Sequence, residues 1–434
     1  MKNKIEEKHK NHFLKYNLKG DFFMRKRLKI GILIITILII SNTNIVWADL
    51  EDNEIDMSIN EINNQVIETT TKINDEPKLN ARIAVIYDRA SGKMIYHKNG
   101  EKQTPMASTT KIMTAIVVLE NANLSDVVTV EAKAAGTGGS RLGLKKNDKI
   151  TVNDLLYGLM LRSGNDAAIA LAIHVGGSVT GFAELMNQKA KELGLVNTHF
   201  VVPHGLDMDG HYTTAYELAK MADYALKNEK IKQIVSTKTA TININGYSKT
   251  INNTNELLGN LNGVYGVKTG FTNGAGRCLV TACKRDNIDI ITVVLGADTK
   301  KVRTTDSIQL IEYAYKNYQM TEIKKKIEED FQKWKEINEK RIVINKGNKK
   351  NIELEIEKMA YEKMAIKNTQ IDNIHLEINS LFYLETPVEE KQTIGSVKVM
   401  IGEETIDTLN IYAKEEIRKK NVTDYLLKFL ELAC

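Results

Sequence analysis

The sequence PMASTTKIMTAIVVLE, residues 105–120, joins a serine and a lysine to a long apolar run. A largely apolar stretch of this length predicts a buried helix, with Ser108 in its first turn. Ser108 and Lys111 are three residues apart, so their side chains meet on one face of that helix. A hydroxyl is a weak nucleophile without a base, and a lysine can be that base where burial or nearby positive charge lowers its pKa. The alternative, a surface lysine, is disfavoured because the residues around Lys111 are apolar.

Two further short motifs follow along the chain, Ser163-Gly164-Asn165 and Lys268-Thr269-Gly270. Each is common alone, since S-G-N is a turn signal and K-T-G fits a turn with an exposed lysine. The ordered set S-x-x-K, S-x-N and K-T-G, however, is typical of enzymes that transfer an acyl group to a serine. In such a site the Ser163 hydroxyl can pass on a proton, and the Asn165 amide can hold Lys111 or a substrate carbonyl.

The third motif lies within GVYGVKTGFT, residues 263–272, which predicts a strand. A strand edge that carries a lysine and hydroxyl groups can bind a substrate carboxylate, and Gly270 lets another backbone approach closely. The backbone N–H groups of Ser108 and Phe271 could form an oxyanion hole. The candidate substrate-binding residues are therefore Lys268, Thr269, Gly270, Phe271 and Thr272.

The chain around these motifs predicts an α+β fold with an antiparallel sheet. Residues 81–87 and 94–96 predict a β-hairpin around a turn cluster. Helical patterns cover residues 152–175 with a break at 162–165, and then 182–193, 214–226 and 306–318. Strand patterns cover 278–282 and 288–295. Because strands flank a helical middle, we assign residues 79–320 to one catalytic domain.

Near residue 320 the composition becomes rich in lysine and glutamate. Alternation with period two then predicts half-buried strands at 342–344, 352–356, 374–378 and 397–401. We assign residues 321–412 to a small β-rich C-terminal domain, in which we find no catalytic constellation. The tail, residues 413–434, has an amphipathic helical pattern that could lie on a membrane surface. A helix that docks on the protein or self-associates fits this pattern equally well.

The N-terminal region has the order of a secretory signal peptide. The basic sequence RKRLK, residues 25–29, precedes an apolar run of eleven residues, 30–40, and then Val46-Trp47-Ala48. This run is too short to span a bilayer comfortably, although a retained membrane anchor is the alternative. We assign residues 1–48 to the signal peptide, with cleavage after Ala48, and residues 49–78 to a flexible acidic linker. The protein is then exported and acts outside the cytoplasm.

Composition and spacing disfavour several other kinds of site. The net charge is +5, but residues 1–29 hold ten Lys/Arg against three acids, so the rest carries −2 and nucleic-acid binding is not expected. Cys278 and Cys283 should face opposite sides of one strand, about 16 Å apart, which is too far for a disulfide. No H-E-x-x-H or paired C-x-x-C indicates a metal site, and no cofactor is expected.

Longer segments around the motifs resemble the low-molecular-mass penicillin-binding proteins, the serine-type D-alanyl-D-alanine carboxypeptidases of bacterial cell-wall metabolism. The resemblance covers about residues 80–410. It rests on GSRLGL (139–144), LMLRSGNDAA (159–168), PHGLD (203–207) and GVKTGFT (266–272). The Ser-Gly-Asn form of the second motif is typical of the carboxypeptidases. Val202 departs from the family, in which many members have asparagine, and it lies in a loop outside the three motifs.

The resemblance implies a β-lactamase/transpeptidase-like catalytic domain, in which an antiparallel sheet has helices on both faces and a helical subdomain. A small β-rich C-terminal domain follows, often with an amphipathic membrane anchor. It also implies that Ser108 attacks the carbonyl between the two D-alanines of a peptidoglycan stem peptide while Lys111 takes its proton. Ser163 would relay a proton to the leaving D-alanine, and Lys268 and Thr269 would grip the terminal carboxylate. β-Lactam antibiotics should acylate Ser108 in the same way.

Other activities share part of this pattern. A D,D-endopeptidase that cuts cross-links attacks the same type of bond. A class A β-lactamase needs a dedicated glutamate for deacylation, and Glu184 is wrongly spaced and lies in a predicted helix. A wall sensor that binds penicillin without turnover is disfavoured by the intact motifs. A Ser-His-Asp hydrolase is disfavoured because no serine lies in a G-x-S-x-G pattern.

Overall fold

The computed structural model describes residues 58–69 and 76–433 of the 434-residue chain. The predicted signal peptide and, within the predicted linker, residues 49–57 and 70–75 therefore lie outside the described residues. Within them, no single helix combines the length and apolar composition needed to cross a bilayer. Only the helices over 165–176 and 179–192, bent by 82°, meet these criteria, and they do so only as a pair.

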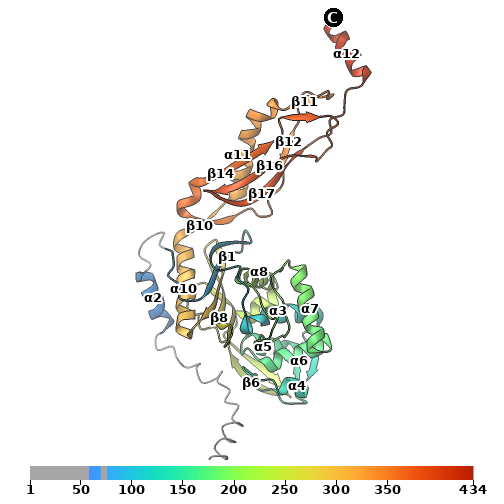
Figure 1. The fold of residues 1–434 in the computed structure, drawn as a ribbon. Coiled ribbons are helices and arrows are strands. Elements are labelled where there is room, and N and C mark those ends of the chain that lie inside the picture. Colours follow the sequence, from blue (N-terminus) through green and yellow to red (C-terminus); the bar gives the residue numbers. More distant parts are fainter. Residues whose placement is uncertain (1–57, 70–75, 434) are drawn as a thin grey trace, which may run out of the picture. The chain divides into compact units, whose positions relative to one another are not determined.

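A five-stranded antiparallel sheet forms the centre of the catalytic domain, in the order β2-β1-β9-β8-β7. Its strands are β1 (Ile83–Asp88), β2 (Lys93–Lys98), β7 (Val264–Thr272), β8 (Gly276–Arg285) and β9 (Ile288–Ala297). Helices cover both faces of the sheet (Figure 1), so β8 and β9 are nearly continuous apolar runs rather than alternating ones. The predicted α+β fold is confirmed.

The two faces of the sheet belong to two separate cores. The first contains η1 (Ala107–Thr110), α3 (Lys111–Asn121), α5 (Val152–Met160), α6 (Asn165–Gly176), α7 (Val179–Glu192), α8 (Ala215–Leu226) and α9 (Glu229–Val235). The second contains α10 (Lys300–Asn317) and α2 (Ile59–Thr69). Cys278 belongs to the first core and Cys283 to the second, and both are free thiols, as predicted.

The prediction of a flexible linker is wrong for residues 59–69, which form helix α2. Ile59, Ile62 and Val66 recur every three or four positions and are buried in the core that α10 also lines. Ser58 begins the helix with a reciprocal cap. Its N–H donates to Glu61 Oε2 at 2.7 Å, and Glu61 N–H donates to Ser58 Oγ at 3.2 Å. We predicted a linker because the segment is acidic overall, although these three apolar residues lie on one face of a helix.

The helical side of the catalytic domain also carries small elements that the sequence patterns did not predict. β3 (Val127–Thr129) and β4 (Lys149–Thr151) form an antiparallel pair, and the short helix α4 (Ala132–Ala135) lies between them in the sequence. A hairpin consists of β5 (Thr239–Ile244) and β6 (Tyr247–Asn252). These elements complete the expected helical subdomain.

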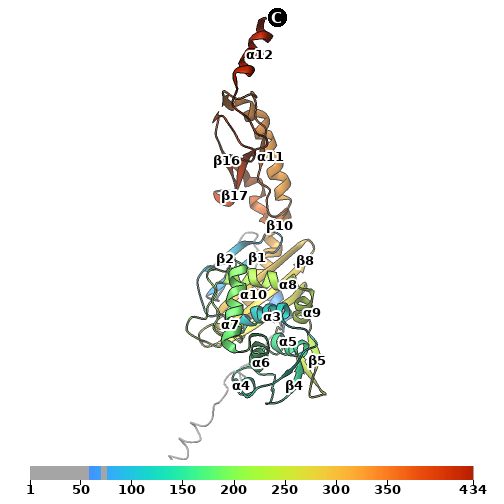
Figure 2. The same cartoon turned by 90° about the vertical axis from the view of Figure 1, so that its right-hand side faces the viewer.

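The C-terminal domain has a four-stranded antiparallel sheet in the order β12-β17-β16-β14, with helix α11 (Ile323–Asn338) along it (Figure 2). Its strands are β12 (Leu354–Ile356), β14 (Ile374–Ser380), β16 (Thr393–Ile401) and β17 (Glu404–Ala413). β10 (Tyr318–Thr321) pairs with β13 (Met364–Lys367), and β11 (Val343–Asn345) with β15 (Tyr383–Glu385). The four predicted strands are present. Helix α11 was missed because its buried positions, Ile323, Ile327 and Phe331, are few among lysines and glutamates.

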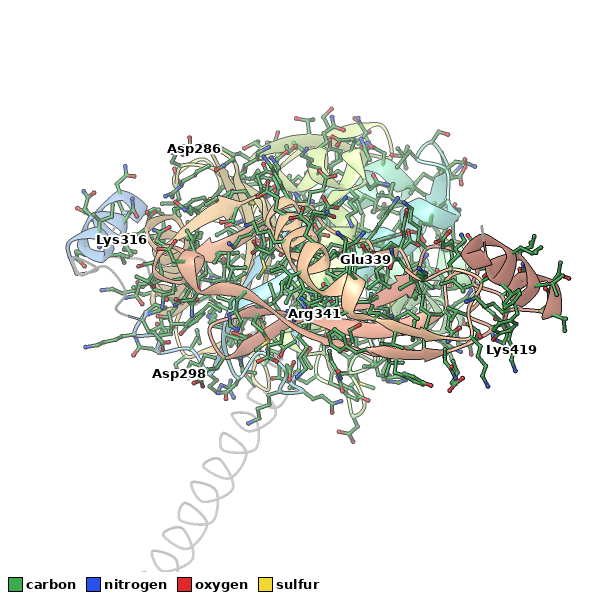
Figure 3. The ribbon with its side chains drawn as sticks, turned by 90° about the horizontal axis from the view of Figure 1, so that it is seen from above. Asp286, Asp298, Lys316, Glu339, Arg341 and Lys419 are labelled. Carbon is green, nitrogen blue, oxygen red and sulfur yellow. The ribbon has the colours of Figure 1, made fainter. Side chains whose placement is uncertain are left out.

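The tail helix α12 (Val422–Ala433) begins later than predicted. Before it the chain is extended, because Ile417 pairs with Val388 and Lys419 pairs with Gly347 in isolated β-bridges. Figure 3 shows Lys419 close to α12, and Glu339 and Arg341 beyond the end of α11. Val422 and Phe429 of α12 are 82% and 71% exposed.

Candidate active site

Ser108 lies on the short turn η1, which leads directly into α3 and packs against β7. Gly270 eases this approach, because a β-carbon there would lie 3.0 Å from Ser108 N and 3.1 Å from Ala107 Cβ, tighter than an ordinary van der Waals contact. On the other side, a β-carbon on Gly205 would lie 1.9 Å from Ala107 O. Two glycines therefore let the serine turn fit between β7 and the loop after Pro203, as predicted for Gly270.

The amine of Lys111 makes three short contacts and is fully buried. Its Nζ lies 2.8 Å from Ser108 Oγ, 2.7 Å from Asn165 Oδ1 and 2.8 Å from His204 O. The amide and carbonyl oxygens can only accept, so they take both N–H groups of a neutral amine. Its lone pair is then left for the one partner that can donate, the Ser108 hydroxyl. The spacing S-x-x-K thus brings nucleophile and base together, as the sequence predicts.

The surroundings of Lys111 favour that neutral amine. Burial lowers its pKa well below the ordinary value, and the positive charge of Lys268 lowers it further. Asp166 opposes this shift, but its carboxylate is occupied elsewhere. It accepts backbone N–H groups from Leu142 at 2.8 Å, Gly143 at 2.8 Å and Leu144 at 2.9 Å.

The second motif lies where α5 ends and α6 begins. Ser163 is buried and has φ 59°, in the left-handed region, so the chain turns sharply there. Asn165 is the first residue of α6, and its side chain bridges two elements. Its Oδ1 accepts from Lys111, while its Nδ2 donates to Gly138 O at 2.8 Å. The amide is therefore oriented by both of its ends.

The third motif is on β7, the strand at one edge of the sheet. Lys268 is 1% exposed, and its Nζ donates to Thr269 O at 2.9 Å. Burial, and then the charge of Arg303, lowers the pKa of Lys268 to about 7. Arg303 is itself buried and donates to Glu256 Oε2 at 2.6 Å. The hydroxyl oxygens of Thr269 and Thr254 are 2.7 Å apart.

The end of β7 holds the neighbouring loop. The Thr272 hydroxyl donates to Asp207 Oδ1 at 2.6 Å, and Gly274 N–H donates to Asp207 Oδ2 at 2.9 Å. The side chain of Thr272 is therefore engaged with the loop, although the sequence predicted a contact with substrate. The ring of Phe271 lies 3.9 Å under the guanidinium of Arg277, which fixes this part of the strand.

Sequence reasoning gave no role to the histidines of the loop that follows α7, yet two lie directly behind the nucleophile. His204 supplies the carbonyl that accepts from Lys111, and His211 contacts Thr110 at 2.8 Å. Burial is the main cause that lowers the pKa of His204 to about 3 and that of His211 to about 4, so both rings are neutral. The PHGLD segment, residues 203–207, was a signal for His204, whereas His211 lies outside it. By contrast, Glu184 is exposed on α7.

The arrangement can activate a hydroxyl, accept its proton and hold an anionic group beside it. The nucleophile and base are in contact, the second hydroxyl lies at the end of α5, and a lysine that titrates near neutrality lies on the adjoining strand. These groups fit acyl transfer from a substrate that carries a carboxylate close to its reactive carbonyl.

Comparisons with known proteins agree with this site. A family model described as D-alanyl-D-alanine carboxypeptidase matches residues 70–299, and one described as the C-terminal domain of penicillin-binding protein 5 matches residues 331–419. The D-alanyl-D-alanine carboxypeptidase DacF of Bacillus subtilis is 33% identical over 355 residues, which cover 80% of this chain and 88% of DacF.

Solved structures are similar over the same range. The D-alanyl-D-alanine carboxypeptidase DacD from Francisella tularensis has a TM-score of 0.64 at 28% identity, covering 81% of this chain and 97% of that one. A variant of the DD-transpeptidase of Streptomyces K15 has a TM-score of 0.54 at 36% identity, covering 55% of this chain and 99% of that one. The first similarity extends beyond the catalytic domain.

Proposed function

The chain belongs to the D-alanyl-D-alanine carboxypeptidase family, and we propose that it removes the terminal D-alanine from peptidoglycan stem pentapeptides through an acyl-enzyme on Ser108. One observation carries the proposal: the buried amine of Lys111, which forms no ion pair among the described residues, lies 2.8 Å from Ser108 Oγ. Ion pairing would keep this lysine charged, whereas its partners here are a hydroxyl, an amide oxygen and a carbonyl oxygen.

In the acylation step Ser108 Oγ attacks the carbonyl carbon between the two D-alanines, and Lys111 Nζ takes the hydroxyl proton. The oxygen of the tetrahedral intermediate lies between the backbone N–H groups of Ser108 and Phe271, which stabilise its negative charge. Gly270 supports this placement, since any side chain there would crowd the backbone of η1 against β7.

The leaving D-alanine needs a proton on its nitrogen. Ser163 relays it, with the proton that Lys111 has taken as its source, and Asn165 keeps the amine in place through its 2.7 Å contact. Lys268 and Thr269 attract the terminal carboxylate from β7. Because Thr272 is engaged with Asp207, its part in this step is to hold the edge of the site.

Hydrolysis of the acyl-enzyme then frees the shortened peptide. Water attacks the ester carbonyl in the same oxyanion hole, and Lys111 serves again as the base. A β-lactam follows the first half of this sequence, but its opened ring stays attached and hinders water. We propose that β-lactams therefore inhibit the enzyme by acylating Ser108.

We further propose that the protein acts outside the cytoplasm, where its substrate is. The leader over residues 1–48 supports export, with cleavage after Ala48. Helix α12 supports contact with the membrane surface, because its apolar residues Val422, Leu426 and Phe429 are 82%, 60% and 71% exposed.

The experiment compares the chain lacking residues 1–48 with three variants. A fluorescent penicillin reports acylation, and D-alanine release from a D-Ala-D-Ala peptide reports turnover. Wild type should do both, Ser108→Ala neither, and Ser163→Ala should turn over slowly. Ser236→Ala is the matched control, because this serine is exposed and its hydroxyl donates to Gln233 O, three residues earlier on the same helix end. Turnover that persists in Ser108→Ala would contradict the mechanism. Cleavage of cross-linked dimers in preference to pentapeptides would make the enzyme an endopeptidase.

A further inference from the structure

The peptide unit between Ala107 and Ser108 links the oxyanion hole to groups behind the nucleophile. Its N–H is the Ser108 donor of the proposed function, on which this inference rests. Its carbonyl, Ala107 O, accepts the Thr110 hydroxyl at 2.8 Å. Because a peptide unit is planar, a hydrogen bond that fixes the C=O direction also fixes the N–H direction.

His211 supplies the next hydrogen bond behind Thr110. Val201 N–H donates to His211 Nδ1 at 3.0 Å, so the proton of the neutral ring is on Nε2. Nε2 lies 2.8 Å from Thr110 Oγ1, whose own hydrogen is directed at Ala107 O. The ring therefore donates to the hydroxyl, and the hydroxyl donates to the carbonyl.

The surroundings leave these groups little freedom. Thr110 is fully buried and His211 is 4% exposed. The Phe200 ring packs edge-on against the His211 ring, with centroids 5.8 Å apart. Gly205 leaves just enough room, since a β-carbon there would lie 2.6 Å from Thr110 Oγ1. Ala107 has φ 48°, an uncommon conformation that needs support from its surroundings.

We propose that Thr110 and His211 are positioning residues that orient and polarise the Ser108 N–H of the oxyanion hole. Hydrogen bonds in a chain strengthen one another, so a carbonyl that accepts from Thr110 makes the N–H of the same peptide a better donor. The benefit is greatest when charge develops on the substrate oxygen. The pair should therefore act on the transition state and little on substrate binding.

The neighbouring Thr109 offers a matched control. Its hydroxyl also donates to a backbone carbonyl three residues earlier, Met106 O, at 2.5 Å, and it is also fully buried. The peptide that it fixes carries the N–H of Ala107, which has no part in the oxyanion hole. Thr109→Val and Thr110→Val thus remove the same kind of bond from two successive peptides.

The test measures kcat and KM for a D-Ala-D-Ala peptide, together with the affinity of an N-acyl boronic acid analogue of D-alanine. Its boron takes up the Ser108 hydroxyl oxygen as a fourth substituent, giving a tetrahedral adduct that imitates the transition state. Thr110→Val should lower kcat and boronate affinity together, each by roughly tenfold, with KM unchanged. Thr109→Val should change kcat and boronate affinity by less than about twofold. Thr110→Ser, which keeps the hydroxyl, should have kcat and boronate affinity close to those of the wild type.

His211→Phe should lower kcat by a similar factor, and the double variant with Thr110→Val should lose little more than either single variant. The inference is overturned if Thr110→Val and Thr109→Val lower kcat by the same factor, or if only KM changes. It is also overturned if Thr110→Val folds normally and Thr110→Ser is as impaired in kcat and boronate affinity as Thr110→Val. A wild type that releases no D-alanine would overturn the proposed function and this inference with it. An active wild type with equal threonine variants would overturn the inference alone.

Discussion

Substrate binding should weaken at alkaline pH, because Lys268 then loses its positive charge. Its pKa is about 7, lowered by burial and by Arg303. The charged form, which attracts the terminal carboxylate, is present below that value and is lost above it. At pH 8 about one lysine in eleven is still charged, so kcat/KM should fall by about tenfold per pH unit above pH 7.

Two changes should remove this decline. In Lys268→Arg the guanidinium stays charged throughout, so kcat/KM should level out between pH 7 and 9, at a lower absolute value because the larger group must fit a fully buried space. The second change is in the substrate. A peptide that ends in D-alaninamide has no carboxylate for Lys268 to attract, so kcat/KM of the wild-type enzyme for this peptide should not decline above pH 7.

The assay is D-alanine or D-alaninamide release at several substrate concentrations between pH 5.5 and 9.5. Because kcat/KM reports the free enzyme and kcat the bound complex, the decline should appear in kcat/KM first. A wild-type profile that stays flat to pH 9 would refute the reasoning. So would an equal decline with the amide substrate, because the titrating group would then act on the chemistry and not on the carboxylate.

Three further changes test other parts of the structure. Asn165→Asp places a carboxylate within 2.7 Å of Lys111 Nζ, so penicillin acylation at pH 7 should slow by about 10- to 1000-fold through a raised lysine pKa. Asp166→Asn replaces one of the two oxygens that accept backbone N–H groups by an NH2 group, which can only donate. Urea unfolding should therefore show that the free energy of unfolding falls by about 1–3 kcal/mol. Ile62→Asp should release α2 from its core, which limited proteolysis near residue 60 would detect while turnover persists.

The sequence was sufficient for the parts of the site that follow from local spacing. Ser108 and Lys111 are three residues apart on one continuous element, so any helical turn brings them together. The strand pattern around Lys268 was equally local. The motifs left open whether the Asn165 amide holds Lys111 or a substrate carbonyl, and the fold brings its Oδ1 to Lys111 across a separation of 54 residues and the His204 carbonyl across 93.

The features that sequence analysis missed depend on which distant segments cover a residue, and residue type alone does not indicate this. Helix α2 was missed because three apolar residues in an acidic segment do not stand out until α10 is there to cover them. Nothing local to Thr272 indicates that its hydroxyl donates to Asp207, 65 residues away, and its contact with substrate stays a prediction. The contact of His211 with Thr110, 101 residues away, is equally hidden from local sequence patterns.

Two lysines of this protein show why a motif alone cannot identify a catalytic base. Lys189 contacts Glu120 at 2.7 Å and Glu192 at 2.5 Å, and hydrogen bonds to these carboxylates raise its pKa. Lys111 also has short contacts, of 2.7–2.8 Å, but all three partners are neutral, and the carboxylate of Asp166 accepts backbone N–H groups. Burial therefore acts on Lys111 without an opposing ion pair, and the amine remains free to take a proton.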